Sequence, residues 1–180
     1  VRDRVQGESK HNEVRRLLES PVSLFARFDQ PAAQKVLDHA SGMSDNLQIH
    51  VPAIAAPGQQ AIHRFSKLPF EKVAAINGAC LGGGFELALA CNKRVASDGK
   101  NVKIGLPEVN LGVLPGFAGS VRLPRLIPLD KALPLILQGK QLDGVRGFKA
   151  GIVDAYLPAQ DFNERAIKWA KANAGKPGRR

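Results

Sequence analysis

The stretch KVAAINGACLGGGFELALACN, residues 72–92, decides the fold. It opens with Lys72–Asn77, a short and nearly all-apolar run bounded by polar residues and by Gly78. Such a run is typical of a strand that is buried on both faces of a parallel sheet. The glycines Gly82–Gly84 follow, and the next segment, FELALACN, is apolar on all sides, which predicts a buried helix. The stretch therefore predicts a strand, a glycine loop and a helix in direct succession.

Strand and helix patterns alternate on both sides of this stretch, which predicts an α/β fold. Upstream, GQQAIHRFSKL is an amphipathic helix pattern that must stop before Pro69, because the residue before a proline disfavours the helical conformation. The expected strands are 21–28, 93–97, 101–105 and 151–157. The expected helices are 32–39, 120–126, 130–137, 144–150 and 161–174, the last with Asp161 as its N-cap.

The chain of 180 residues has the length of one domain, and its texture changes near Pro57. We divide it into a divergent or incomplete N-terminal segment at 1–57, a core at 58–158, and a C-terminal helix and tail at 159–180. No apolar run reaches the roughly 18 residues that cross a bilayer. The first residues also lack the apolar stretch of a secretory signal. We therefore expect a soluble protein that is not secreted.

The net charge of +10 comes entirely from residues 57–180, since residues 1–56 hold as many acidic as basic side chains. Such a surplus could attract phosphates, RNA or an acidic partner, or it could simply solvate helix faces. The two cysteines, Cys80 and Cys91, have neither metal-binding spacing nor a nearby His/Asp cluster. We expect them to be small buried thiols, and we expect no metal site.

Glycine is concentrated in the centre of the chain, where nine of the 18 glycines fall within Gly78–Gly119. A strand, the loop NGACLGGG and a buried helix in this order leave loop amides at the positive end of the helix dipole. Amides placed in this way can hold a developing oxyanion. A nucleotide phosphate site is disfavoured, because neither G-x-x-x-x-G-K-[ST] nor G-x-G-x-x-G occurs. Tight packing of the helix on the strand is the other explanation for these glycines.

Two glutamates lie near this loop in apolar surroundings. Glu86 is two residues past Gly84, and Glu108 follows Pro107 in GLPEVNLGVLPG. Each alone could be an ordinary acidic residue in the first turn of a helix. Together they suggest a pair of carboxylates placed for proton transfer.

These segments match a known family. KVAAINGACLGGGFELALACNKRVAS (72–97) and KIGLPEVNLGVLPGFAGSVRLPRLI (103–127) resemble the crotonase superfamily of enoyl-CoA hydratases and isomerases. The resemblance is nearest to the hydratase/isomerase part of the multifunctional fatty-acid oxidation α-subunits. It implies a ββα spiral core at 58–158. It also suggests that the N-terminal half and the C-terminal helices of the family are shortened in this chain.

The resemblance implies a 2-enoyl-CoA hydratase of fatty-acid β-oxidation, in the bacterial cytoplasm or an organelle matrix. It implies a coenzyme A thioester as substrate and no cofactor. A Δ3–Δ2 isomerase is one alternative, and a non-catalytic module that binds RNA or a partner through its basic surface is another. A homo-oligomer or a place in a multifunctional complex is expected, with no membrane span. The basic surplus is expected to meet CoA phosphates rather than nucleic acid, since few aromatic residues could stack bases.

The implied site residues are few. Glu86 and Glu108 match the catalytic glutamates, and the Gly83 amide matches the oxyanion donor. The remaining residues expected around the substrate are Gly82, Gly84, Pro107, Gly116 and Phe117.

Two departures from the family pattern stand out. The family's PGxGGT is PGFAGS here, at residues 115–120, where Ser120 could still cap a helix. The upstream loop that supplies a second oxyanion amide has no clear counterpart. Residues 28–40 faintly resemble the family's first strand and turn, whereas gap-free counting places Leu37 and Asp38 at that loop.

Overall fold

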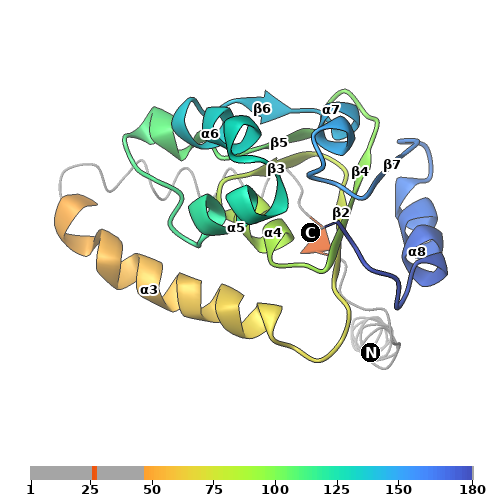
Figure 1. Ribbon diagram of the computed structural model, residues 1–180, viewed down its shortest axis with the longest axis horizontal. Coiled ribbons are helices and arrows are strands. Elements are labelled where there is room, and N and C mark those ends of the chain that lie inside the picture. Colours follow the sequence, from red (N-terminus) through yellow and green to blue (C-terminus); the bar gives the residue numbers. More distant parts are fainter. Residues whose placement is uncertain (1–25, 28–46, 180) are drawn as a thin grey trace, which may run out of the picture.

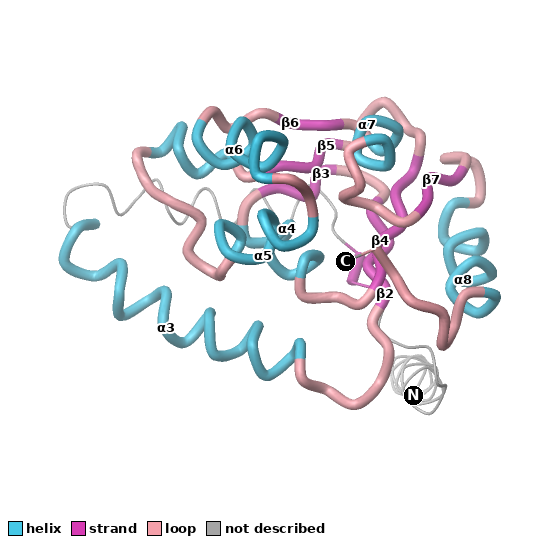
Figure 2. Tube along the Cα trace, in the orientation of Figure 1, coloured by secondary structure: helices cyan, strands magenta, loops and turns pink. Residues whose placement is uncertain are grey.

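Two β-sheets organise the part of the chain that the computed structural model describes, Ala26–Arg27 and residues 47–179. The first sheet is entirely parallel, in the order β1 (Ala26–Arg27), β2 (Val73–Ile76), β4 (Lys93–Ser97) and β7 (Ala155–Leu157). The second has the order β3 (Ala79–Leu81), β5 (Lys103–Gly105) and β6 (Gln141–Leu142), with β3 and β5 parallel and β6 antiparallel. Figure 2 places β3, β5 and β6 together at the top, apart from β2, β4 and β7.

Helices fill the space around and between the sheets. They are α3 (Leu47–Ser66), α4 (Gly83–Leu89), α5 (Gly119–Leu126), α6 (Leu129–Leu137), α7 (Gly144–Lys149), α8 (Phe162–Ala172) and a 3-10 helix, η1 (Pro107–Leu111). In Figure 1, α3 runs along the lower edge of the molecule and α8 lies at the right beside β7.

Strand β2 is buried on both faces, as its apolar sequence predicts. Its residues Val73 and Ala75 pack in a small cluster with Phe162 of α8. The alternate residues, Ala74 and Ile76, face the main core. Because side chains alternate across a strand, a sheet covered on both sides requires apolar residues at every position.

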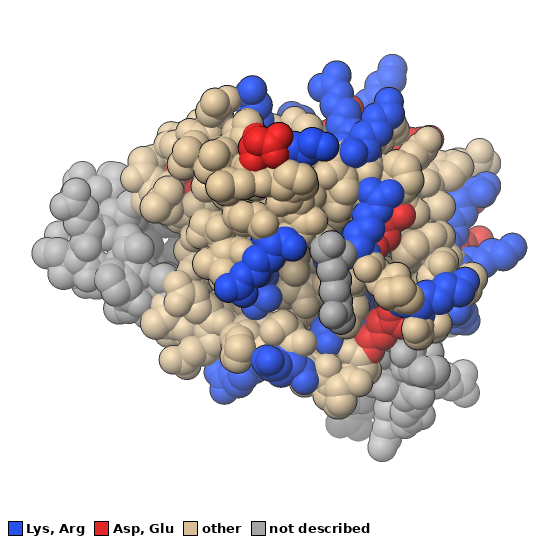
Figure 3. All heavy atoms as spheres, viewed as in Figure 1, with Lys and Arg blue, Asp and Glu red and all other residues tan. Residues whose placement is uncertain are grey.

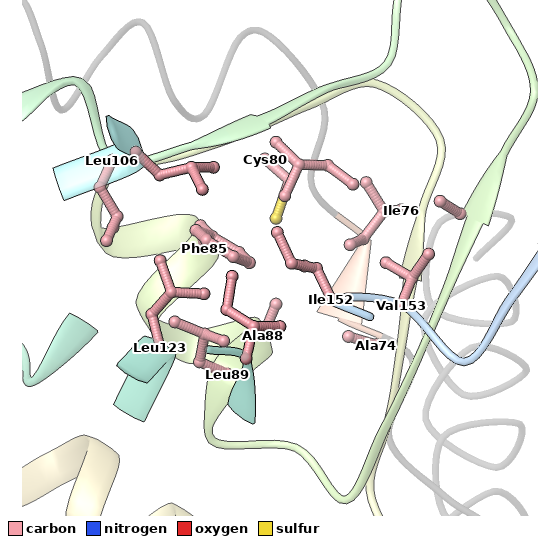
Figure 4. Packing of buried hydrophobic residues seen from close by; sticks show 14 of the residues in the cluster. Ala74, Ile76, Cys80, Phe85, Ala88, Leu89, Leu106, Leu123, Ile152 and Val153 are labelled. Atoms are coloured by element: carbon pink, nitrogen blue, oxygen red, sulfur yellow. The ribbon is translucent and has the colours of Figure 1, made fainter. Parts of the chain in front are cut away.

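The main core lies around α4. Phe85, Ala88 and Leu89 of this helix pack in one cluster with Ile152 and Val153, close to Ala74, Ile76 and Cys80 (Figure 4). Phe85 and Ala88 are fully buried. The prediction that Gly82–Gly84 opens a buried helix is confirmed.

Helix α3 differs from the sequence prediction at its start. It begins at Leu47 rather than at residue 58, and so it crosses the predicted boundary between residues 57 and 58. Pro52 and Pro57 lie within it, and prolines usually mark the end of a helix pattern. Its end at Ser66, before Pro69, is as predicted.

Smaller differences concern strands and caps. Strands β3 and β6 were not predicted, and β7 covers only the end of the predicted strand 151–157. Asp161 is the N-cap of α8, but its side chain makes no capping bond and its φ is 54°. Ser120 does not cap α5, whose N-cap is Ala118. Of the predicted strand 21–28 only Ala26–Arg27 is described, and residues 28–40 lie outside the described residues.

Both cysteines are buried and unpaired, as predicted. Burial raises the pKa of the Cys91 thiol to about 11 and that of Cys80 still further. Figure 4 places the Cys80 sulfur inside the apolar core near Phe85.

Two buried cations stand at the start of β4. Lys93 is 2% exposed, pairs with Glu71 and donates a bond of 2.5 Å to the carbonyl of Asn173. Arg94 is equally buried and donates to the carbonyls of Ile152 and Cys91 at 2.8 and 3.0 Å. These two side chains are structural and contribute nothing to a basic surface.

The exposed lysines and arginines are spread over several elements on the face that Figure 3 shows, with acidic side chains among them. No helix in the described part of the chain is long and apolar enough to span a membrane.

Candidate active site

The glycine loop closes against Glu108. Gly82 has φ 54° and ψ −131°, a conformation that favours glycine, and its amide donates to the carbonyl of Gly105 at 3.0 Å. A methyl group on Gly82 would lie 3.1 Å from Oε1 of Glu108. Helix α4 begins at the next residue, Gly83, and no side chain in the described part of the chain caps it. The first amides of a helix have no partner within the helix, so those of Gly83 and Gly84 can bind a ligand.

Glu86 lies in the first turn of α4 and is almost completely buried, with 1% exposed. Its Oε1 accepts two hydrogen bonds of 2.7 Å, from the amides of Phe117 and Gly119. Ala118, between these amides, has φ 77°. A left-handed residue turns the amides on either side of it toward one point, which forms a small concave anion site. The loop at 115–119 thus fixes the Glu86 carboxyl group with backbone donors.

Opposing effects set the ionisation of Glu86. Burial raises the pKa of Glu86 above its usual range. The hydrogen bonds from Gly119 and Phe117 and the positive charge of Arg122 oppose this effect and favour the carboxylate. A buried carboxylate with two amide donors can remain charged because its lost hydration is replaced.

Glu108 has fewer partners. It is the second residue of η1, after Pro107, and its Oε2 is buried with no hydrogen-bond partner in the described structure. Burial raises the pKa of Glu108 to about 7, a hydrogen bond from its own backbone lowers it, and repulsion from Glu86 raises it. Oε1 of Glu108 faces Gly82, the N-cap of the helix α4 that carries Glu86. The structure therefore brings Glu86, Glu108 and the glycine loop together.

Phe117 joins the loop at 115–119 to two helices. A methyl group on Gly83 would lie 3.2 Å from one edge of its ring, and a methyl group on Gly58 of α3 would overlap the opposite edge. Next to Gly58, the Gln59 side chain donates to the carbonyl of Gly116 at 2.7 Å. Phe117, predicted to border the substrate, thus lies beside Gly83, and Gly116, predicted with it, contacts Gln59 of α3.

Four residues of this site were not predicted. They are Gly58, Gln59, Gly119 and Arg122. The glycine pattern of residues 115–120 could have pointed to Gly119, whereas nothing in the sequence links α3 to this loop.

The family model described as enoyl-CoA hydratase/isomerase matches residues 40–178. The chain belongs to the enoyl-CoA hydratase/isomerase family.

Among curated proteins, the fatty acid oxidation complex subunit alpha of Aliivibrio fischeri is 57% identical over 118 residues, which are 66% of this chain and 17% of that protein. The subunit of the same name from Vibrio vulnificus is 52% identical over 126 residues, or 18% of its length. The chain therefore spans less than a fifth of these relatives.

Solved structures of the family share the fold. An enoyl-CoA hydratase from Bacillus anthracis superimposes with a TM-score of 0.65 at 33% identity, over 72% of this chain and 50% of that one. The predicted crotonase fold is thus confirmed. The match to this family supports a crotonase-type function.

In the described part of the chain, no group of three or more His, Cys, Asp and Glu side chains could hold a metal ion. The roles of Glu86, Glu108 and the loop residues in catalysis stay predictions, as does the division into segments at residues 57 and 158.

Proposed function

We propose that this chain is a 2-enoyl-CoA hydratase, which adds water across the 2,3 double bond of enoyl-CoA thioesters in fatty-acid β-oxidation. The observation that carries the proposal is that Glu86 and Glu108 flank the Gly82–Gly84 loop in unlike surroundings, one held by two backbone amides and the other with an oxygen that has no partner in the described structure. Hydration of an enoyl thioester needs a base for the water and an acid for C2 within one small volume.

The surroundings of the two groups suggest their roles. Glu86 accepts two backbone hydrogen bonds, which favour its charged form, so we assign it as the base. Glu108 has an orphaned oxygen and a pKa of about 7, so we assign it as the acid. Glu86 takes a proton from water while the water oxygen bonds to C3. The electrons of the double bond move toward the thioester oxygen, and Glu108 delivers its proton to C2. A proton then passes from Glu86 to Glu108 to restore the starting state.

The negative charge that develops on the thioester oxygen needs hydrogen-bond donors. We assign the amide of Gly83, at the uncapped start of α4, as one of them. Removing one such donor costs about 3 kcal/mol in other enzymes. The second donor was expected upstream, at residues outside the described part of the chain. The proposed reaction transfers only protons and water, so it requires no cofactor.

The names of the relatives extend the proposal to an assembly. The two α-subunits are named as parts of a fatty acid oxidation complex. We propose that this chain likewise works in a homo-oligomer or a multifunctional complex, in the bacterial cytoplasm or an organelle matrix.

The test is hydration of crotonyl-CoA, followed by loss of the enoyl thioester absorbance, with the parent and with Glu86→Gln and Glu108→Gln. Glutamine keeps the shape of each side chain but removes proton transfer. We expect turnover to fall by about 100-fold or more in each variant, with little change in acyl-CoA affinity.

Glu164→Gln is the control, because Glu164 is exposed on α8, far along the chain from the glycine loop. It should keep the activity of the parent. Full activity in both Glu86→Gln and Glu108→Gln would refute the assignment.

A further inference from the structure

Arg122 is a cation beside the site that the proposed mechanism does not use. It lies on α5, half-buried, and its Nε is buried without a hydrogen-bond partner in the described structure. Its backbone amide donates to the carbonyl of Ala118 at 2.8 Å. Arg122 and Gly119 therefore lie in the same first turn of α5, and the Gly119 amide donates a hydrogen bond to Glu86. A buried donor without a partner is rare and needs an explanation.

The charges around Glu86 are few. Helix α4 packs against α5 and β3, and β3 carries only Ala79, Cys80 and Leu81. On α5 the charged residues are Arg122 and Arg125, and Arg125 is exposed. From η1, Glu108 is a further ionisable group at this loop, and burial raises its pKa to about 7. In the described part of the chain, Arg122 is the one side chain whose charge favours the carboxylate form of Glu86.

We propose that Arg122 is a positioning residue that keeps Glu86 ionised, as a base requires. The inference rests on the proposed hydratase function, because it assigns a role within that same site. A guanidinium group stays protonated at every pH at which the protein is folded, so its charge is permanent. It acts on Glu86 through space, since the hydrogen bonds of the carboxylate come from the amides of Phe117 and Gly119.

The electrostatic consequence has a definite sign. Without the positive charge of Arg122, only the two amide hydrogen bonds oppose the effect of burial, so the pKa of Glu86 should rise further. A protonated Glu86 cannot accept a proton from water. Activity relative to the parent should then be lost on the acidic side of the pH profile and recover as the pH rises.

The experiment compares Arg122→Met, Arg122→Lys and the control Arg125→Met, which removes an exposed charge from the same helix. The first readout is the titration of the Glu86 carboxyl carbon by NMR without substrate, assigned with Glu86→Gln. The second is kcat/KM for crotonyl-CoA against pH. We expect Arg122→Met to move the Glu86 titration and the acidic limb of the kcat/KM profile to higher pH. Its kcat/KM should be about tenfold lower than that of the parent near pH 6 and should approach the parent's value near pH 9. Arg122→Lys should restore most of the shift, and Arg125→Met should cause none.

The outcomes separate the two proposals. A uniform loss of activity with an unchanged Glu86 titration would overturn the role of Arg122 and leave a packing role. A shifted titration in a chain without hydratase activity would support Arg122 and refute the proposed function. If Arg122→Met does not fold, Arg122→Gln serves as the neutral variant, because its amide preserves a hydrogen-bond donor. An unshifted titration in Arg122→Gln would overturn the proposal equally.

Discussion

Gly119→Ala should destabilise the protein and disable the site together. A methyl group on Gly119 would lie 2.8 Å from Cγ and 2.9 Å from Oε1 of Glu86, and 3.1 Å from Cδ2 of Leu106. Ordinary contacts between carbon atoms are about 3.5–4.0 Å. Glu86 is 1% exposed and Leu106 is fully buried, so neither side chain has free space into which it could move.

The cost has two parts. Overpacking a core by one methyl group typically costs about 1–3 kcal/mol. Displacing Glu86 also weakens its bond to the Gly119 amide, and a hydrogen bond to a charged group contributes about 1.5–3 kcal/mol. We therefore expect the free energy of unfolding to fall by roughly 3–5 kcal/mol. A carboxylate displaced by even about 1 Å should lower turnover about 100-fold.

Urea unfolding and the crotonyl-CoA assay measure the two effects. Gly147→Ala is the matched control, because Gly147 is also a buried glycine in a helix, but a methyl group there would lie 3.3 Å from Ile104 and farther from Val153. Alanine is the better helix former by about 1 kcal/mol, which offsets the slightly close contact with Ile104, so this control should change the free energy of unfolding by less than about 1 kcal/mol. A Gly119→Ala protein with the stability and activity of the parent would show that Glu86 is not held as we describe.

Two further predictions concern stability. Because the pKa of Glu108 is raised from 4.5 to about 7, the folded protein should lose stability as pH rises through this range, whereas Glu108→Gln, which keeps only the raised pKa of Glu86, should lose less. Urea midpoints measured across this range test this, and parallel curves for the two proteins would contradict it. Glu71→Gln should cost about 3–5 kcal/mol in urea unfolding, because it leaves Lys93 buried without its counter-charge. Arg146→Met, which breaks an exposed ion pair, should cost less than about 1 kcal/mol, and equal losses in the two variants would argue against a buried pair at Lys93.

The sequence predicts the core well where burial alone requires apolar residues. Val73–Ile76 is apolar at every position, and only a strand covered on both faces needs this pattern. The glutamates Glu86 and Glu108 could be selected because both lie in apolar surroundings near glycines. The strand prediction depends on local pattern alone, which is why it transfers to the structure, whereas the roles of the two glutamates stay predictions.

The other features of the site depend on contacts between distant segments. Pro52 and Pro57 are residues that usually mark the end of a helix, yet α3 continues through them. Gln59 of this helix then donates a hydrogen bond to the carbonyl of Gly116, which lies 57 residues later in the chain. The role of Gly119 requires knowledge that its amide faces Glu86, 33 residues before it. In the sequence, Arg122 resembles an ordinary residue on a solvated helix face. Only the packing of α5 on α4 shows that its positive charge acts on Glu86.

The strained backbone at Ala118 helps to hold Glu86 in its ionised form. A residue other than glycine in the left-handed region costs about 1–2 kcal/mol, and Ala118 has φ 77°. The same conformation aims the amides of Phe117 and Gly119 at one oxygen of Glu86. Each of these bonds to a charged acceptor contributes about 1.5–3 kcal/mol, so the pair outweighs the strain while Glu86 is ionised. Once Glu86 is protonated the bonds weaken and the strain remains. The loop at 115–119 therefore favours the ionised form of Glu86, which is the form that a base must have before water is bound.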